Sequence, residues 1–179
     1  LSLIFAEIVA AAGVPAGAYN VVTGMGAEIG DDLTSHSDVN FVTFTGSTVV
    51  GQHINEICAK NKTPSTLELG GKSPTVVLAD ADLDKVMPLA ARSIFMFAGQ
   101  ACIGSSRFYV ERPIYEEFVK RFTMICSKVG MGDLRDPNTV IAPIISDRQR
   151  QRVKDHIADA VAKGATLAAG GEWEGNRCQ

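Results

Sequence analysis

The chain has 179 residues, of which 46% are hydrophobic and 21% are charged, and its formal net charge at pH 7 is −3. This composition is typical of a globular protein with one domain or two small ones. The acidic balance provides no basic surface field of the kind that attracts nucleic acid or an anionic membrane, so neither partner is expected.

The cysteines and the first residues indicate the cellular compartment. The four cysteines form no C-x-x-C pair and have no metal-ligand spacing with the three histidines, so we expect free thiols, no metal and a reducing compartment. The apolar residues 1–6 lack a basic leader and are too short to span a bilayer. A cytoplasmic location is therefore predicted. An organellar location stays open, because the chain does not begin with Met.

Hydrophobic spacing and capping residues predict the elements of the first 70 residues. Apolar residues at helical spacing indicate a helix over residues 1–12, which Gly13 ends. Ser47 follows a β-rich run that ends in glycine, and it is a good N-cap for a helix that reaches about Lys60. The other elements predicted here are strands over 19–22, 39–45 and 65–69 and a short helix over 27–33.

The remaining residues continue the alternation of strands and helices. Asp80 or Asp82 is expected to cap the next helix, which Gly99 ends. The predicted helices are 83–98, 113–129 and 146–163, and the predicted strands are 75–79, 108–111 and 166–168, with a loop over 131–145. Strands that alternate with helices form mainly parallel sheets, so the fold class is α/β.

The segment from Phe44 to Gly51 carries a possible phosphate site. A strand that ends at Gly46 and a helix that begins after Ser47 present free backbone N–H groups and a positive helix end, which suit a pyrophosphate. Gly46 permits a tight turn, and Gly51 permits the helix to pack closely against a sheet or a ligand. The same pattern is also typical of plain helix capping.

Two further glycine-containing segments hold candidate residues. Residues 24–30 have the composition of a dinucleotide fingerprint but are one residue too long for G-x-G-x-x-G, so the sequence alone favours a turn at Gly24. Glu68 lies in an apolar strand just before Gly70 and Gly71, where it is a general base if it faces a cavity and an ordinary surface carboxylate if it faces solvent. The two glycines leave room around this carboxylate.

Cys102 follows the predicted helix end at Gly99, in the stretch Gly-Gln-Ala-Cys. Its neighbours are uncharged and mostly small, so a buried inert thiol is one interpretation. A thiol nucleophile paired with a base is the other, because these two groups form and then hydrolyse a covalent acyl intermediate. The other cysteines and the three histidines have no such context and are expected to be packing or surface residues.

Taken together, residues 44–51, residues 66–74 and the Gly-Gln-Ala-Cys stretch resemble the aldehyde dehydrogenase superfamily along nearly the whole chain. The resemblance implies an oxidoreductase that converts an aldehyde to a carboxylic acid with NAD or NADP. It implies Rossmann-type parallel sheets with flanking helices, divided into the end of a cofactor-binding domain (1–70) and the start of a catalytic domain (71–179). It also implies that Cys102 is the nucleophile and Glu68 the general base, and that the cofactor is contacted by Gly24, Gly46, Ser47, Gly51 and Leu69.

The resemblance further implies that an intact enzyme is more than twice this long and forms dimers or tetramers. Its asparagine donor to the oxyanion and its ribose-binding lysine would lie before Leu1, and a further cofactor-binding glutamate would lie after Gln179. We therefore expect little activity from this polypeptide alone. Two alternatives stay open: a relative that passes the acyl group to coenzyme A, and a non-catalytic binding or structural protein with the same fold.

Overall fold

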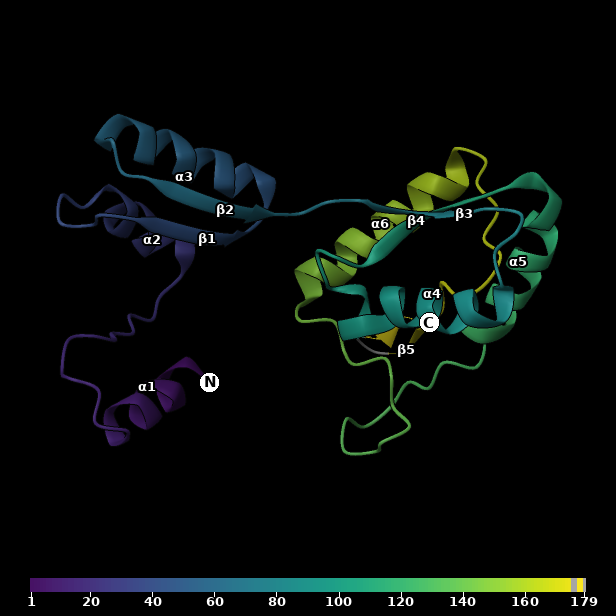
Figure 1. The fold of residues 1–179 in the computed structure, drawn as a ribbon, viewed down its shortest axis with the longest axis horizontal. Coiled ribbons are helices and arrows are strands. Elements are labelled where there is room, and N and C mark those ends of the chain that lie inside the picture. Colours follow the sequence, from purple (N-terminus) through teal and green to yellow (C-terminus); the bar gives the residue numbers. More distant parts are fainter. Residues whose placement is uncertain (175–176, 179) are drawn as a thin grey trace. The chain divides into compact units, whose positions relative to one another are not determined.

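The computed structural model describes residues 1–174, 177 and 178, and its fold divides into two compact units, Leu1–Gly70 and Gly71–Gln179 (Figure 1). The end of the predicted second domain, Gln179, lies outside the described residues. Each unit contains a pair of parallel strands with helices packed against it. This alternation confirms the predicted α/β class.

The first unit is built around a parallel pair of strands, β1 and β2. Its elements in chain order are α1 (Ser2–Ala11), α2 (Gly26–Ser35), β1 (Val42–Gly46), α3 (Thr48–Asn61) and β2 (Ser65–Leu69). The register pairs Val42 with Ser65 at one end and Gly46 with Leu69 at the other. Helix α3 packs against both strands and against α2 (Figure 1).

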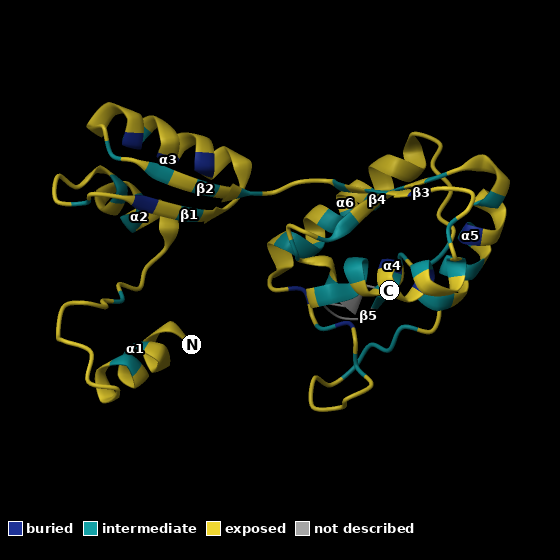
Figure 2. Ribbon diagram, viewed as in Figure 1, coloured by how far each residue is buried: buried dark blue, intermediate teal, exposed yellow. Residues whose placement is uncertain are grey.

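Local sequence explains how α3 begins and ends. The Ser47 hydroxyl accepts a hydrogen bond from the Val50 N–H at 3.4 Å, as expected of an N-cap. Lys62 ends the helix in the left-handed region, at φ 59°. Between these ends, Ile54 and Cys58 are buried together with Val42 of β1, and this cluster is the core of the first unit (Figure 2).

The second unit contains another parallel pair, β3 and β4. Its elements in chain order are β3 (Ser73–Val77), α4 (Leu83–Phe95), a 3₁₀ turn (Met96–Gly99), β4 (Ser105–Val110), α5 (Arg112–Cys126), α6 (Asp147–Ala162), β5 (Trp173–Glu174) and β6 (Arg177–Cys178). The strands β5 and β6 pair antiparallel. Side chains cap both α4 and α6: Asp82, one of the two predicted caps of α4, accepts from the Asp84 N–H, and Ser146 accepts from the Gln149 N–H.

The core of the second unit lies where β3, α4 and α5 meet. Val77, Met87 and Phe118 are buried there, one from each of these elements (Figure 2). The rings of Phe108 and Phe122 pack against Phe118, with centroids 5.7 Å from it in both cases. Aromatic rings bury large apolar areas, so this cluster fixes β4 and α5 against the rest of the unit.

Two of the predicted strands are absent from the structure, and the bounds of several other elements differ from those predicted. Neither 19–22 nor 166–168 forms a strand, because no other strand among the described residues lies beside them to accept their backbone hydrogen bonds. The helix predicted over 83–98 ends earlier, at Phe95, because Phe97 and Ala98 take left-handed backbone angles. In addition, none of the helices in the described part of the chain is long and apolar enough to cross a bilayer.

Candidate functional site

Four of the predicted cofactor residues come together at the carboxyl ends of β1 and β2. Gly46 and Leu69 are partners in the strand register. Ser47 follows Gly46 and caps α3. A methyl group built on Gly51, one turn into α3, would lie 2.4 Å from Leu69 Cδ2. Ligands of open α/β sheets bind outside the carboxyl ends of the strands, and this cluster occupies such a position.

The backbone of this cluster is suited to an anionic group. Gly46 and Ser47 are both exposed. The first N–H groups of α3 have no acceptor within the helix, and they carry the positive end of its dipole. Gly46 also has little room for a side chain, since a methyl group there would lie 2.5 Å from the Phe44 ring. These residues therefore suit an anionic group such as a phosphate.

Gly24 lies elsewhere in the same unit. It forms a bend just before α2, where a methyl group would lie 2.9 Å from Ile29 Cδ1. No contact described in the structure links Gly24 to the cluster at the ends of β1 and β2. Its predicted part in cofactor binding therefore stays a prediction from the resemblance.

Glu68 projects from the exposed face of β2. Burial alternates along the strand, with Leu67 and Leu69 half-buried and Glu68 exposed between them. In the parallel register Glu68 pairs with Thr45, one position before the Gly46–Leu69 pair. The carboxylate is thus accessible and comes from the same strand end as the candidate cofactor residues.

Cys102 lies in the second unit, in the turn that leads into β4. Its side chain is exposed, whereas Cys58 is buried and Cys126 is half-buried. The Gly104 N–H donates to the Ala101 carbonyl at 3.1 Å and closes the turn around Cys102. The Ser73 hydroxyl, at the start of β3, lies 3.5 Å from the Cys102 carbonyl. The thiol is therefore open to reagents on a turn whose backbone is held.

The segment just before Cys102 has an unusual backbone. Phe97, Ala98 and Gly99 have positive φ angles of 52°, 55° and 73°. This region costs a non-glycine residue about 1–2 kcal/mol, so other contacts must maintain it. Strained backbone of this kind is common at functional sites, and residues 97–99 lie just before the Cys102 thiol in the chain.

Gln100 supplies two of these contacts. Its side-chain Nε2 donates to the Phe97 carbonyl at 3.1 Å, and its Oε1 accepts from the Ile145 N–H at 3.0 Å. The side chain therefore ties the segment before Cys102 to the loop before α6, 45 positions further along the chain. The sequence gives no sign of this link, because a backbone N–H such as that of Ile145 leaves no residue-type signal.

Cys126 and His53, which the sequence predicts to be packing or surface residues, lie in surroundings of that kind. Burial raises the pKa of the half-buried Cys126 thiol. His53 on α3 lies 2.8 Å from the Asp31 carboxylate of α2, at the surface. No group of three or more metal-ligating side chains occurs in the described parts of the chain, 1–174 and 177–178.

Comparison with known proteins finds relatives along the whole chain. The profile of the aldehyde dehydrogenase family matches residues 1–179. The NADP-dependent succinate-semialdehyde dehydrogenase of Escherichia coli (strain K12) is 43% identical over 171 residues, covering 96% of this chain and 36% of that enzyme. Human aldehyde dehydrogenase 1A1 is 42% identical over 173 residues, covering 96% of this chain and 34% of that enzyme. The chain thus spans about a third of the length of these relatives.

Solved structures share the fold. An aldehyde dehydrogenase from Bacillus cereus in complex with NAD+ matches with a TM-score of 0.93 at 39% identity, covering 97% of this chain and 36% of that chain. An NADP-dependent enzyme from Escherichia coli matches with a TM-score of 0.95 at 41% identity, covering 99% of this chain and 38% of that chain. These likenesses confirm the predicted fold class.

Proposed function

The chain belongs to the aldehyde dehydrogenase family, and we propose that the protein oxidises an aldehyde to a carboxylic acid through a covalent intermediate on Cys102. The observation that carries this proposal is the exposed thiol of Cys102, on a turn that follows a strained segment anchored by Gln100. A nucleophile must be accessible to its substrate and held in position, and the exposure of the Cys102 side chain and the hydrogen bond that closes its turn support this role.

In the first stage, the Cys102 sulfur adds to the aldehyde carbon, and a carbon–sulfur bond forms while the carbonyl oxygen becomes an oxyanion. A bound NAD or NADP would supply the acceptor for the hydride, that is, the two electrons and one proton that must leave this carbon. A thioester on Cys102 remains. Splitting the oxidation in this way replaces one difficult step by two easier ones.

In the second stage, Glu68 takes a proton from water, and the resulting hydroxide adds to the thioester carbon. The carbon–sulfur bond then breaks, the thiolate of Cys102 is restored, and the carboxylic acid leaves. The exposure of Glu68 on β2 supports this role, because the base must reach solvent water. A coenzyme A-acylating enzyme has no need of this base, and it would release an acyl thioester in place of the free acid.

The cofactor contacts are proposed from the cluster at the carboxyl ends of β1 and β2. Gly46 and Ser47 would hold the diphosphate through backbone N–H groups, while Gly51 and Leu69 would form the adjoining wall. Gly24 is a further proposed contact on the resemblance alone. On this view, unit Leu1–Gly70 is the end of a cofactor-binding domain and unit Gly71–Gln179 the start of a catalytic domain, in a cytoplasmic dimer or tetramer.

Spectrophotometry of the full-length protein across a panel of aldehydes, with NAD and with NADP, tests the proposal. We expect NAD(P)H to form together with the free carboxylic acid, and we expect Cys102→Ala to abolish it. The variant Cys126→Ala is the matched control, because its thiol is half-buried on α5. NAD(P)H formation by Cys102→Ala at the rate of this control would overturn the proposal.

A further inference from the structure

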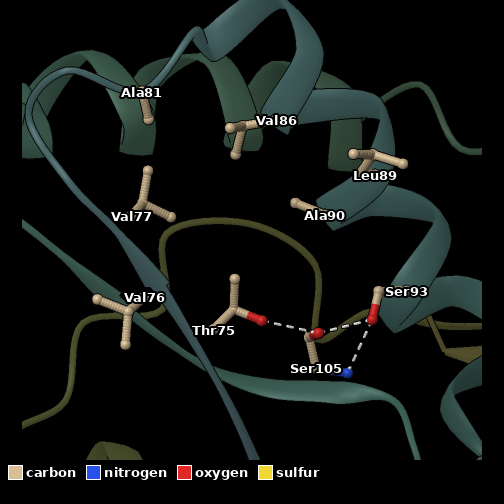
Figure 3. Close-up of a pocket in the computed structure, with 9 residues that line it drawn as sticks. All are labelled: Thr75, Val76, Val77, Ala81, Val86, Leu89, Ala90, Ser93 and Ser105. Carbon is tan, nitrogen blue, oxygen red and sulfur yellow. Dashed lines mark hydrogen bonds between the residues drawn. The ribbon is translucent and has the colours of Figure 1, made fainter.

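Three hydroxyl groups outside the proposed chemistry join the two ends of the loop that carries Cys102. The Ser93 hydroxyl, on α4, donates to the Ser105 hydroxyl at 2.6 Å and accepts from the Ser105 N–H at 3.0 Å. The Thr75 hydroxyl, on β3, donates to the Ser105 hydroxyl at 2.8 Å. Figure 3 shows the three side chains pointing toward one another. Two separate hydrogen bonds thus connect one pair of residues.

Ser93 and Ser105 lie on either side of the loop that carries Cys102. Ser93 lies in the last turn of α4, and Ser105 is the first residue of β4. Between them lie the strained residues 97–99 and the turn of Cys102. Since both hydrogen bonds span the whole loop, they fix the distance between its two ends.

A glycine contact reinforces this closure. A methyl group built on Gly104 would lie 3.3 Å from the Ser93 carbonyl and 3.2 Å from the Ala101 carbonyl. The backbone just after Cys102 therefore lies directly against the end of α4. With Gln100 anchoring the start of the loop, the turn of Cys102 is held on both sides.

From these contacts we propose that Ser93 is a positioning residue for the Cys102 nucleophile, acting through Ser105. The inference rests on the proposed function, in which the sulfur must meet the aldehyde carbon in a productive geometry. Ser93 itself contacts neither substrate nor cofactor in this proposal. Its hydroxyl holds the far end of the loop, and a small displacement of a reacting atom is enough to slow a reaction about a hundredfold.

The surroundings of Ser93 allow a conservative rescue. Thr75, Ser93 and Ser105 line a cavity of about 290 Å³, whose other walls include Val77, Val86 and Ala90 (Figure 3). A threonine at position 93 keeps the hydroxyl, and we expect the cavity beside Ser93 to accept the added methyl group. Ser106 supplies a matched control, because it follows Ser105 on β4 but is exposed.

The test measures single-turnover NAD(P)H formation and KM values in the full-length protein and its variants. We expect Ser93→Ala to slow single turnover about tenfold, with KM for NAD(P) within about twofold of the wild-type value. Ser93→Thr should restore the rate to within about threefold, and Ser106→Ala should leave it unchanged. If Ser93 had a purely structural role, Ser93→Ala would instead lower the thermal midpoint. It would not slow single turnover selectively, and Ser93→Thr would have no rate to restore.

The outcomes separate this inference from the proposed function. Single turnover abolished by Cys102→Ala but unchanged by Ser93→Ala would overturn the inference alone. Turnover that survives Cys102→Ala would overturn both. If Ser93→Ala does not fold, Ser105→Ala tests the same link, because it removes the hydroxyl acceptor and keeps the N–H donor. A loss of about threefold is expected there, and an unchanged rate would overturn the inference.

Discussion

Gly51 in helix α3 lies directly against the Leu69 side chain at the end of strand β2. A methyl group built at position 51 would be 2.4 Å from Leu69 Cδ2, which is well inside van der Waals contact. The absence of a side chain is what lets α3 approach β2 so closely. Because Gly46 pairs with Leu69 in the register, this contact also fixes the strand end on which the cofactor residues are proposed.

Replacing Gly51 by valine should therefore weaken both packing and cofactor binding. The added side chain must displace Leu69, and overpacking of this kind costs about 1–3 kcal/mol. We expect a lower thermal midpoint for the full-length protein and a higher Kd for NAD(P) in a fluorescence titration. Gly30→Ala is the control, because no atom lies within 4 Å of that position and alanine favours the α2 helix. Equal thermal midpoints and equal Kd values for the two variants would contradict this account of Gly51.

A substitution at Ala98, whose backbone is left-handed, should raise the stability of the protein, whereas the substitution at Gly51 should lower it. Glycine has no side-chain penalty at φ 55°, so Ala98→Gly should stabilise the protein by about 0.5–1 kcal/mol after its added freedom in the unfolded chain is counted. Ala91→Gly, in the regular part of α4, should destabilise it by about 1 kcal/mol. Thermal or urea unfolding compares the two. A loss of stability in both variants would show that Ala98 is not strained in solution.

Cys126 should ionise at a higher pH in the folded protein than in the unfolded chain. Burial raises its pKa above the ordinary value of 9.0, because it disfavours the thiolate. The part of the free energy of unfolding that depends on the neutral Cys126 thiol is fully present below about pH 9. It is lost as the pH rises through the folded-state pKa. Alkylation of the Cys126 peptide, followed by mass spectrometry against pH with and without urea, measures both midpoints. Coinciding midpoints would contradict the prediction.

Most elements are predictable from the sequence because their signals are local. Alternating residues predict β2 over Ser65–Leu69, the bounds that it has in the structure. Ser47 predicts the start of α3, and the pair Asp80 or Asp82 predicts that of α4, since a capping side chain needs only the first turn of its own helix. Strands are harder, because residues 19–22 and 166–168 have suitable composition but no neighbouring strand among the described residues.

The reactive residues of the candidate site are predictable from the sequence, whereas the contacts that hold them in place are less so. Glu68 and Cys102 can be singled out because a carboxylate before paired glycines and a Gly-Gln-Ala-Cys stretch match a family pattern. The link between Ser93 and Ser105 cannot, since it depends on how α4 and β4 come together in the folded unit. The same holds for the left-handed angles at Phe97 and Ala98, which tertiary contacts impose on residues that favour other conformations.

The central claim is that Cys102 carries the acyl group and that Glu68 is needed to release it. The most direct measurement is rapid-quench mass spectrometry of full-length Glu68→Gln after mixing with aldehyde and NAD(P), with Glu56→Gln, an exposed carboxylate on α3, as the matched control. We predict one burst of NAD(P)H per active site and an acyl group on the Cys102 peptide. Its release should be slower than in the control by about a hundredfold or more. An acyl group on another residue, or release at the control rate, would contradict the account.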